Sequence, residues 1–263
     1  MMRLVPKANI WRKGALLYRG LRYRRGYGVH SPFVFNLITK VIEEKCSYYS
    51  FYDIELLRRE LYYREDKLSC PDRSHPGRMK YRQIGEIVYR EAIKPSHGKL
   101  LFRLANYFKS QRILQIGPNV GISTLYLTSY AKEVRCIALE NVPQFAEIAR
   151  QAFERAEKRI DLRVGSYASL LPQALRDLGE VDLVYFNTLY EQQHTEALFE
   201  SCLPYVGDWT LFVFEGIKSS QRMRAFWDAV CARPEVTVTI DLYTMGIVFF
   251  NPKLHKQNYI VYF

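Results

Sequence analysis

The sequence predicts an α/β fold: a doubly wound, mostly parallel sheet that ends in an antiparallel hairpin and follows an N-terminal helical region. After residue 110, short apolar runs alternate with helical segments, as in parallel sheets joined by helical crossovers. Only three residues separate the last two runs, which is too few for a crossover. Before residue 111 the apolar positions recur at helical spacing. We therefore expect a helical region, residues 1–110, and an α/β domain, residues 111–263.

The N-terminal region is predicted to be a series of helices. Ile10, Leu17 and Leu21 fall on one helical face. Ser31 followed by Pro32 is a strong helix start, because the hydroxyl can cap the helix and proline suits its first turn. Further helices are expected at about 33–42, 53–64, 80–93 and 100–108, and a loop rich in proline and glycine at 69–78.

Seven apolar runs predict the strands of the second domain. They are residues 112–116, 134–139, 162–164, 181–186, 210–214, 236–242 and 246–250. Segments of helical length separate the first five, as right-handed crossovers require. The last two runs form the predicted hairpin.

The net charge of +11 arises entirely in the N-terminal region. Residues 1–110 hold 23 Lys and Arg against 10 Asp and Glu, a net of +13, whereas residues 111–263 carry −2. Tyrosines are interleaved with the arginines before the first acid, Glu43. Such a mixture can bind phosphate and stack on bases. Two interpretations stay open: a surface for RNA or another anionic partner, and a solvated basic arm.

Composition also bears on the location of the protein. No apolar run approaches the roughly 18–20 residues that cross a bilayer, so no transmembrane segment is expected, and the first residues lack a signal-peptide pattern. The five cysteines form no C-x-x-C pair. This favours reduced thiols in the cytoplasm over a disulfide framework or a zinc site.

A glycine-rich turn, QIGPNVGIS, joins the first predicted strand to a helix. Glycines at such a turn let a ligand approach the backbone closely. Glu140 ends the second strand, 23 residues after Gly117, where an acid can accept both hydroxyls of a ribose. The sequence therefore predicts a nucleoside-containing ligand at the carboxyl edge of the sheet. The candidate contacts in the turn are Gln115, Gly117, Pro118, Asn119, Gly121 and Ser123.

The G-x-x-x-G spacing and the terminal hairpin differ from the dinucleotide-binding pattern and resemble class I S-adenosylmethionine-dependent methyltransferases. The turn is similar to the E-x-G-x-x-x-G-x-S of the catechol O-methyltransferase-like branch. Gly165 and Ser166, followed by Leu-Leu-Pro, resemble the G-D-A…L-P element of that branch. The resemblance implies a Rossmann-like methyltransferase sheet with S-adenosylmethionine as cofactor.

A second resemblance runs over nearly the whole chain, to a group of class I methyltransferase-like proteins typical of Bacteroidetes. It rests on three stretches: GYGVHSPFV at 26–34, the segment 99–108, and TIDLYTMGIVFF at 239–250. The resemblance implies the fold and the cofactor class, and it leaves the methyl acceptor open.

The chain departs from these relatives where they carry acids. Gln115 replaces the acid of the first strand, and Asn187 replaces an Asp that binds magnesium in the metal-dependent branch. A neutral Asn is a poor sole anchor for a hard dication, so no metal site is expected. One hypothesis is methyl transfer from S-adenosylmethionine to an unidentified acceptor, an anionic one among the candidates, without metal assistance. The alternative is a catalytically silent S-adenosylmethionine-binding or nucleic-acid-binding protein.

Each remaining site residue has a functional and a structural interpretation. Asn141 is expected near the adenine or simply in a turn. Asn119 and Ser123 contact the methionine carboxylate or cap the backbone. The candidate catalytic residues are Tyr190, Glu215 and Lys218; the alternatives are packing for Tyr190 and a surface ion pair for the other two. The remaining histidines, His97 among them, show no metal-binding spacing.

Overall fold

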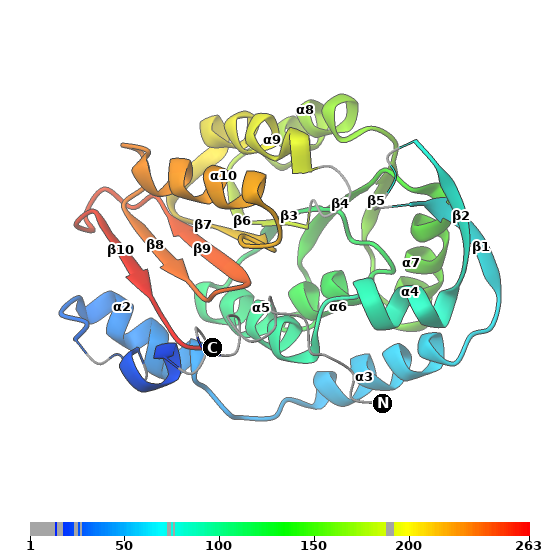
Figure 1. Cartoon of the computed structure of the whole chain (residues 1–263), viewed down its shortest axis with the longest axis horizontal. Coiled ribbons are helices and arrows are strands. Elements are labelled where there is room, and N and C mark those ends of the chain that lie inside the picture. The colour runs from blue at the N-terminus through cyan, green and yellow to red at the C-terminus, as the bar shows by residue number, and fades with distance from the viewer. Residues whose placement is uncertain are drawn as a thin grey trace, which may run out of the picture.

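The computed structural model describes residues 14, 18–23, 26, 28–72, 75, 77–187 and 192–263. Within them, eight strands form one sheet in the order β10-β8-β9-β7-β6-β3-β4-β5 (Figure 1). Only β9 runs antiparallel to its neighbours, β7 and β8. The strands are β3 (Arg112–Ile116), β4 (Arg135–Glu140), β5 (Asp161–Val164), β6 (Val181–Phe186), β7 (Val206–Glu215), β8 (Val238–Asp241), β9 (Met245–Phe249) and β10 (Gln257–Ile260). The predicted doubly wound sheet and its C-terminal hairpin are confirmed.

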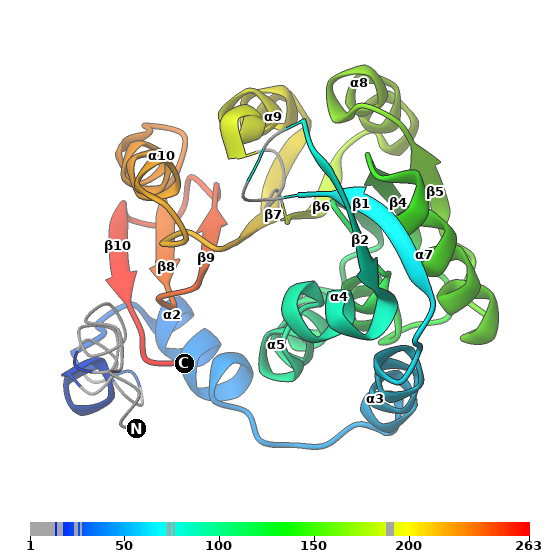
Figure 2. The same cartoon turned by 45° about the vertical axis from the view of Figure 1, so that its right-hand side comes forward.

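Helices cover both faces of this sheet (Figures 1 and 2). On one face pack α8 (Tyr167–Leu178), α9 (Thr195–Cys202) and α10 (Gln221–Ala232). On the other face pack α5 (Pro95–Phe108), α6 (Ile122–Thr128) and α7 (Pro143–Arg155). The N-terminal helices α2 (Pro32–Leu37), α3 (Tyr49–Tyr62) and α4 (Ile84–Glu91) join that second layer.

The side chains of each central strand alternate between two hydrophobic cores. In β6, Leu183 and Tyr185 belong to the core under α5, whereas Val184 and Phe186 belong to the core under α8 and α9. Successive side chains of a strand point to opposite faces, and both faces are buried here. This explains why the strands appear in the sequence as continuous apolar runs rather than as alternating patterns.

The predicted helix start at Ser31 is confirmed. The hydroxyl of Ser31 accepts a hydrogen bond from the Val34 N–H at 3.4 Å, and Pro32 occupies the first turn. The helix continues as a π-helix, Ile38–Ile42. Its apolar residues are buried in the same core as one face of the sheet, so the N-terminal region contributes directly to the packing of the α/β domain.

The sequence predicts that Leu21 lies on an apolar helical face, and this prediction is wrong. Leu21 is 81% exposed, while Ile10 and Leu17 lie outside the described residues. Arg19 of the same helical turn is buried instead, because its guanidinium pairs with Asp241 of β8. An ion pair, rather than an apolar stripe, directs this turn toward the sheet.

Two features were not predicted. The first is an antiparallel pair beside α4 and α7, formed by β1 (Lys67–Pro71) and β2 (Met79–Gln83) (Figure 2). β1 overlaps the start of the predicted loop, and β2 replaces the first turn of the helix predicted at 80–93, which begins only at Ile84. β2 is mostly exposed and β1 mostly half-buried, and a buried ion pair between Arg82 and Glu91 ties the pair to α4. The second feature is β10, a polar strand parallel to β8 at the edge of the sheet.

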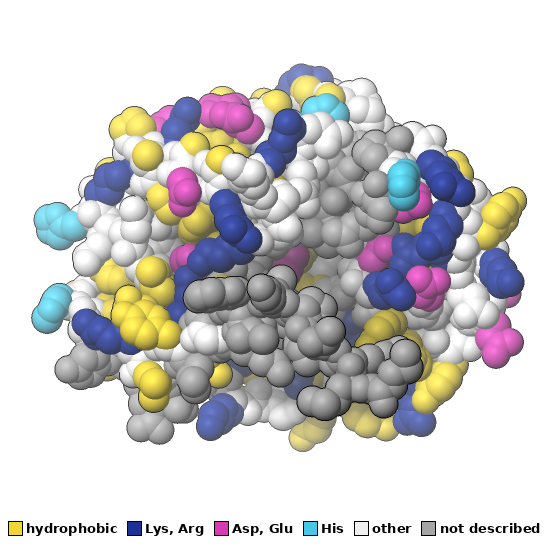
Figure 3. Space-filling model, in the orientation of Figure 1, with side chains coloured by type: hydrophobic (Ala, Val, Ile, Leu, Met, Phe, Trp, Pro, Cys, Tyr) yellow, Lys and Arg dark blue, Asp and Glu magenta, His cyan; other side chains and the backbone are white. Residues whose placement is uncertain are grey.

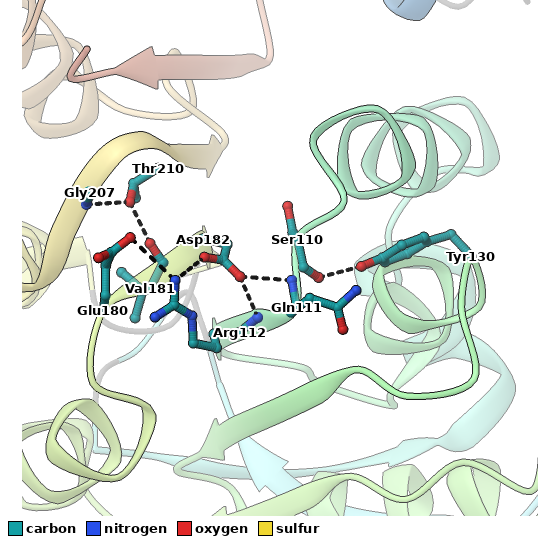
Figure 4. A network of polar contacts seen from close by, with 9 residues as sticks. All are labelled: Ser110, Gln111, Arg112, Tyr130, Glu180, Val181, Asp182, Gly207 and Thr210. Atoms are coloured by element: carbon teal, nitrogen blue, oxygen red, sulfur yellow. Dashed lines mark hydrogen bonds and ion pairs between the residues drawn. The ribbon is translucent and has the colours of Figure 1, made fainter. Parts of the chain in front are cut away.

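A polar network fixes the amino ends of the central strands (Figure 4). Asp182 Oδ2 accepts hydrogen bonds from the backbone N–H groups of Gln111 and Arg112, both at 2.7 Å, and its Oδ1 accepts one from the Arg112 guanidinium at 2.6 Å. These bonds join the start of β3 to β6. They lie at the opposite edge from the glycine-rich turn, so this turn lies at the carboxyl edge of a fixed pair of strands.

Candidate functional site

Four predicted site residues lie at the carboxyl ends of adjacent strands. In spatial order they are Glu140 at the end of β4, Gly117 after β3, Asn187 after β6, and Glu215 at the end of β7. Neighbouring strands lie about 4.8 Å apart. The row therefore spans three strand spacings along one edge of the sheet.

The glycines of the turn are required by close packing. Gly117 and Gly121 have φ values of +75° and +86°. A Cβ atom at Gly117 would lie 2.3 Å from the carbonyl oxygen of Asn187, and one at Gly121 would lie 2.8 Å from the ring of Phe153. The turn is closed by the Gly121 N–H, which donates to the Pro118 carbonyl at 3.0 Å. The turn thus lies tightly between β6 and α7.

Glu140 is 2% exposed, and its carboxylate holds the turn. Its Oε2 accepts a hydrogen bond from the Asn119 N–H at 2.8 Å, and its Oε1 accepts one from the Val142 N–H at 3.0 Å. Asn119 itself has a φ of +54°. These contacts tie the carboxylate of Glu140 both to the glycine-rich turn and to the segment that follows β4.

The segment after β5 completes this end of the site. The Gly165 N–H donates to the carbonyl of Glu140 at 2.9 Å. Ser166 precedes α8, and the hydroxyl of Tyr167 donates to Asn141 Oδ1 at 3.1 Å. The structure therefore brings Asn141, Gly165 and Ser166 next to Glu140.

Two buried amide oxygens, on or just after strands between those of Glu140 and Glu215, have no hydrogen-bond partner among the described residues. The Gln115 amide donates from Nε2 to Ser123 Oγ at 2.6 Å, and the Asn187 amide donates from Nδ2 to the Gly117 carbonyl at 3.0 Å. Gln115 Oε1 and Asn187 Oδ1 accept no hydrogen bond from the described residues. A buried unsatisfied acceptor costs about 1–3 kcal/mol, so the pair indicates a ligand that donates hydrogen bonds.

The predicted catalytic residues do not form one group. Lys218 Nζ lies 2.6 Å from Asp241 Oδ2, and Arg19 binds the same carboxylate through two nitrogens at 2.9 and 3.0 Å. Both cations also lie over the ring of Tyr243. Burial opposes ionisation of Asp241, but the hydrogen bonds from Arg19 and Lys218 outweigh it and lower the pKa of this carboxyl. Arg19 and Asp241 are 222 residues apart, and no sequence signal pairs them.

Glu215 belongs to a different cluster. Its carboxylate lies 3.0 Å from His97 Nδ1 and accepts a hydrogen bond from the hydroxyl of Tyr185 at 3.2 Å. His97 Nε2 lies 3.1 Å from Thr244 Oγ1. Burial, with the nearby carboxylate, raises the pKa of Tyr185 well above its usual value, so its phenol stays neutral. Sequence reasoning missed the pairing of His97 and Thr244: His97 belongs to no motif, and the stretch 239–250 that contains Thr244 carries no sign of a partner on α5.

The third predicted catalytic residue, Tyr190, lies outside the described residues. Among the residues that the structure does describe, no group of three His, Cys, Asp or Glu is placed to hold a metal ion. No helix in the described ranges is long and apolar enough to cross a membrane.

Comparisons with known proteins agree with this geometry. Residues 114–217 match the Methyltransf_24 family, described as a methyltransferase domain. The chain is 29% identical over 100 residues to a catechol O-methyltransferase of Niastella koreensis, covering 36% of this chain and 45% of the relative. It is 35% identical over 101 residues to a catechol O-methyltransferase of Mycobacterium tuberculosis, covering 37% and 45%. The chain thus spans about half the length of the curated relatives it matches.

The fold is also found in a solved structure. The S-adenosylhomocysteine-bound methyltransferase of Podospora anserina superimposes with a TM-score of 0.61 over 95% of this chain and 99% of that one, at 12% identity. At this identity the likeness concerns the fold alone. The segment that matches the methyltransferase-domain family, residues 114–217, begins in β3 and ends just after Glu215. It includes the whole row of strand ends described above. Residues 114–217 thus match a methyltransferase domain, and part of the chain is similar to catechol O-methyltransferases.

Proposed function

We propose that the protein binds S-adenosylmethionine along the row of strand ends and transfers its methyl group to an oxygen of an acceptor bound beside Glu215. The observation that carries this proposal is the pair of unsatisfied acceptors, Gln115 Oε1 and Asn187 Oδ1. An ammonium group has three N–H donors and no acceptor. The amino group of the cofactor would therefore satisfy both oxygens at once.

The other parts of the cofactor fit the neighbouring strand ends. The carboxylate of Glu140 would accept the ribose hydroxyls, with Asn141, Gly165 and Ser166 on the adenine side. Pro118, Asn119 and Ser123 would border the methionine end. In this order the end of the cofactor that carries the methyl group would lie on the side of β7, where Glu215 ends the strand. When bound, the cofactor supplies a methyl group on a positively charged sulfur, and the protein contributes mainly by positioning the acceptor in line with it.

We further propose that the transfer needs no divalent metal. The catechol-type relatives are expected to hold magnesium through an Asp where this chain has Asn187. Here the amide of Asn187 bonds the backbone of the glycine turn instead. A chelator such as EDTA should therefore leave the rate of methyl transfer unchanged, and added magnesium should not raise it. A rate that falls with EDTA and returns with magnesium would contradict this part of the proposal.

The charges beside Glu215 favour an anionic acceptor. Arg19 and Lys218 share the single carboxylate of Asp241, so this trio carries a net positive charge. Lys218 is the more exposed of the two cations. A carboxylate or phosphate on the acceptor would be attracted there.

Calorimetry with S-adenosylhomocysteine tests cofactor binding. Replacing Glu140 by Gln should weaken binding by about tenfold or more, because hydrogen bonds to a charged group are worth about 1.5–3 kcal/mol. Glu147→Gln, on the exposed side of α7, is the matched control and should bind as the wild type does. A wild-type protein that binds neither S-adenosylmethionine nor S-adenosylhomocysteine would refute the proposal.

A catalytically silent binding protein is the second candidate. It is favoured by one observation: the carboxylate of Glu215 and the ammonium of Lys218 both already have partners within the protein. Incubation of the protein with tritiated-methyl cofactor and cell-extract fractions separates the two candidates. Label transferred to any fraction supports the enzyme, and tight cofactor binding without transfer supports the silent protein.

A further inference from the structure

A hydroxyl, an imidazole and a carboxylate stand in series at the acceptor end of the site. Thr244 Oγ1 lies 3.1 Å from His97 Nε2, and His97 Nδ1 lies 3.0 and 3.1 Å from the two oxygens of Glu215. A carboxylate only accepts hydrogen bonds, so Nδ1 carries the proton. In the neutral ring Nε2 is then an acceptor, and the Thr244 hydroxyl donates to it.

His97 is the buried member of the series, and both of its partners are partly exposed. His97 is 5% exposed, whereas Thr244 and Glu215 are half-buried. Thr244 lies in the turn between β8 and β9, and its carbonyl accepts the N–H groups of Gly216 and Ile217 at 2.6 and 3.3 Å. These bonds fix the turn against the loop that follows β7. Because Thr244 is partly exposed, an acceptor can reach its hydroxyl.

The series also lies on the correct face of the sheet. Gln115 and Tyr185 are paired neighbours in β3 and β6, and Tyr185 pairs with Val213 in β7. Paired residues of neighbouring strands share a face, as do residues two apart in one strand. Gln115, Tyr185 and Glu215 therefore face α5, the helix that carries His97.

We propose that Thr244, His97 and Glu215 form a proton relay that removes the proton of a neutral hydroxyl acceptor, an inference that rests on the proposed methyl transfer. The acceptor hydroxyl gives its proton to Thr244 Oγ1 as Thr244 gives its own to His97 Nε2. The acceptor oxygen forms the bond to the methyl carbon, and the electron pair of the breaking carbon–sulfur bond stays on sulfur. The imidazolium that results is balanced by Glu215 and later releases its proton to water.

The relay defines an acceptor class. An acceptor with one un-ionised hydroxyl, such as a phenol, needs a base, and the relay supplies it. A second, neighbouring hydroxyl to chelate a metal is not required. By contrast, an acceptor whose oxygen is already ionised gains nothing from the relay. The two kinds of acceptor therefore distinguish a proton relay from a merely structural cluster.

Two probes of different acidity test the relay, with tritiated methyl transfer measured at pH 8. Phenol is un-ionised at this pH, whereas 4-nitrophenol is largely ionised. His97→Asn keeps an amide donor toward Glu215 but has no base, so methylation of phenol should fall by about a hundredfold. Methylation of 4-nitrophenol should fall by less than threefold.

Thr244→Val should repeat this pattern, because it removes the hydroxyl. Thr244→Ser keeps a hydroxyl and should restore the rate with phenol. The exposed His255→Asn is the matched control.

The outcomes separate this inference from the proposed function. Calorimetry with S-adenosylhomocysteine should give the same affinity for the wild type and all four variants. Equal losses with both probes would mean a structural cluster and would overturn the relay. A wild type that binds the cofactor product but methylates neither probe would overturn the hydroxyl acceptor class alone. A partly unfolded variant lowers both rates together, so the ratio of the two rates still distinguishes a proton relay from a structural cluster.

Discussion

At the scale of single residues, Asp241 contributes to stability through its charge. Its pKa is lowered by Arg19 and Lys218 despite burial, so the folded state favours the ionised form. The resulting stabilisation is present above the unfolded-state pKa of about 3.9 and is lost as pH falls through the lower folded-state pKa. Asp241 thus anchors the N-terminal turn only at pH values at which its carboxyl is ionised.

We predict that Asp241→Asn lowers the free energy of unfolding by about 3 kcal/mol at pH 7, because the buried Arg19 and the partly exposed Lys218 lose their counter-charge. The difference from the wild type should shrink below about pH 4, where the wild-type carboxyl begins to protonate. Urea unfolding at several pH values measures both effects. Asp208→Asn, on an exposed part of β7, is the control; a loss that stays constant down to pH 2 would argue against the charge effect.

Gly117 gives a second prediction at this scale. Gly117→Ala would place a Cβ atom 2.3 Å from a backbone oxygen, at a φ of +75°. The combined strain and overlap should cost about 3 kcal/mol or more. Gly179→Ala has a similar φ of +69° but open space around it, so it should cost about 1 kcal/mol. Thermal unfolding compares the two, and equal losses would contradict the packing argument.

At the scale of elements, the sequence was sufficient to predict the positions of strands that are buried on both faces. The runs at 112–116 and 181–186 coincide with β3 and β6. It was insufficient for β2 and β10, which are mostly exposed, and for the mostly half-buried β1, because none of these strands shows an apolar run. Among site residues, those in the glycine turn and at strand ends could be predicted from spacing. His97 and Thr244 could not, because the fold alone brings them together, 147 residues apart in the chain.

The junction of β3 and β6 gives a prediction for these elements. Asp182→Ala removes the acceptor of two backbone N–H groups at the start of β3. We expect the free energy of unfolding to fall by about 1–2 kcal/mol, since water replaces part of the lost bonding. Glu180→Ala, which removes only a 3.3 Å contact to the same arginine, should change it by less than about 0.5 kcal/mol. Urea denaturation measures both changes. If Asp182→Ala leaves the free energy of unfolding unchanged, the network does not fix the strands.

At the scale of the whole molecule, the positive charge concerns a surface rather than the fold. The described part of the N-terminal region exposes Tyr63, Tyr81 and Tyr89, each by at least 67%. Figure 3 shows lysines and arginines gathered on the right, where Figure 1 places the β1–β2 hairpin. Arg78 and Lys80 are exposed there. Exposed tyrosines among cations can bind single-stranded nucleic acid, whereas the cation of Arg19 is already paired with Asp241.

We therefore predict that a single-stranded uridine oligomer binds this surface and is released by salt. Each phosphate contact should contribute about 0.7 to the slope of log affinity against log salt. Arg78→Glu with Lys80→Glu should weaken binding and reduce the slope, and Arg222→Glu on α10 is the control. Fluorescence anisotropy measures these effects. An affinity that does not fall with added salt would argue against a contact driven by phosphate.

The proposed acceptor end is built differently from the proposed cofactor end. Residues that would contact the cofactor come from one continuous stretch, 115–187, within the segment shared with the family. Apart from Glu215, the acceptor end is built from residues outside that segment: Arg19 near the N-terminus, His97 on α5, and Asp241 and Thr244 near the C-terminus. Two proteins of the family can therefore keep the same cofactor chemistry while they diverge in acceptor. Synthesis of the chain must also reach the C-terminal hairpin before the acceptor end exists, because Asp241 and Thr244 lie in that hairpin.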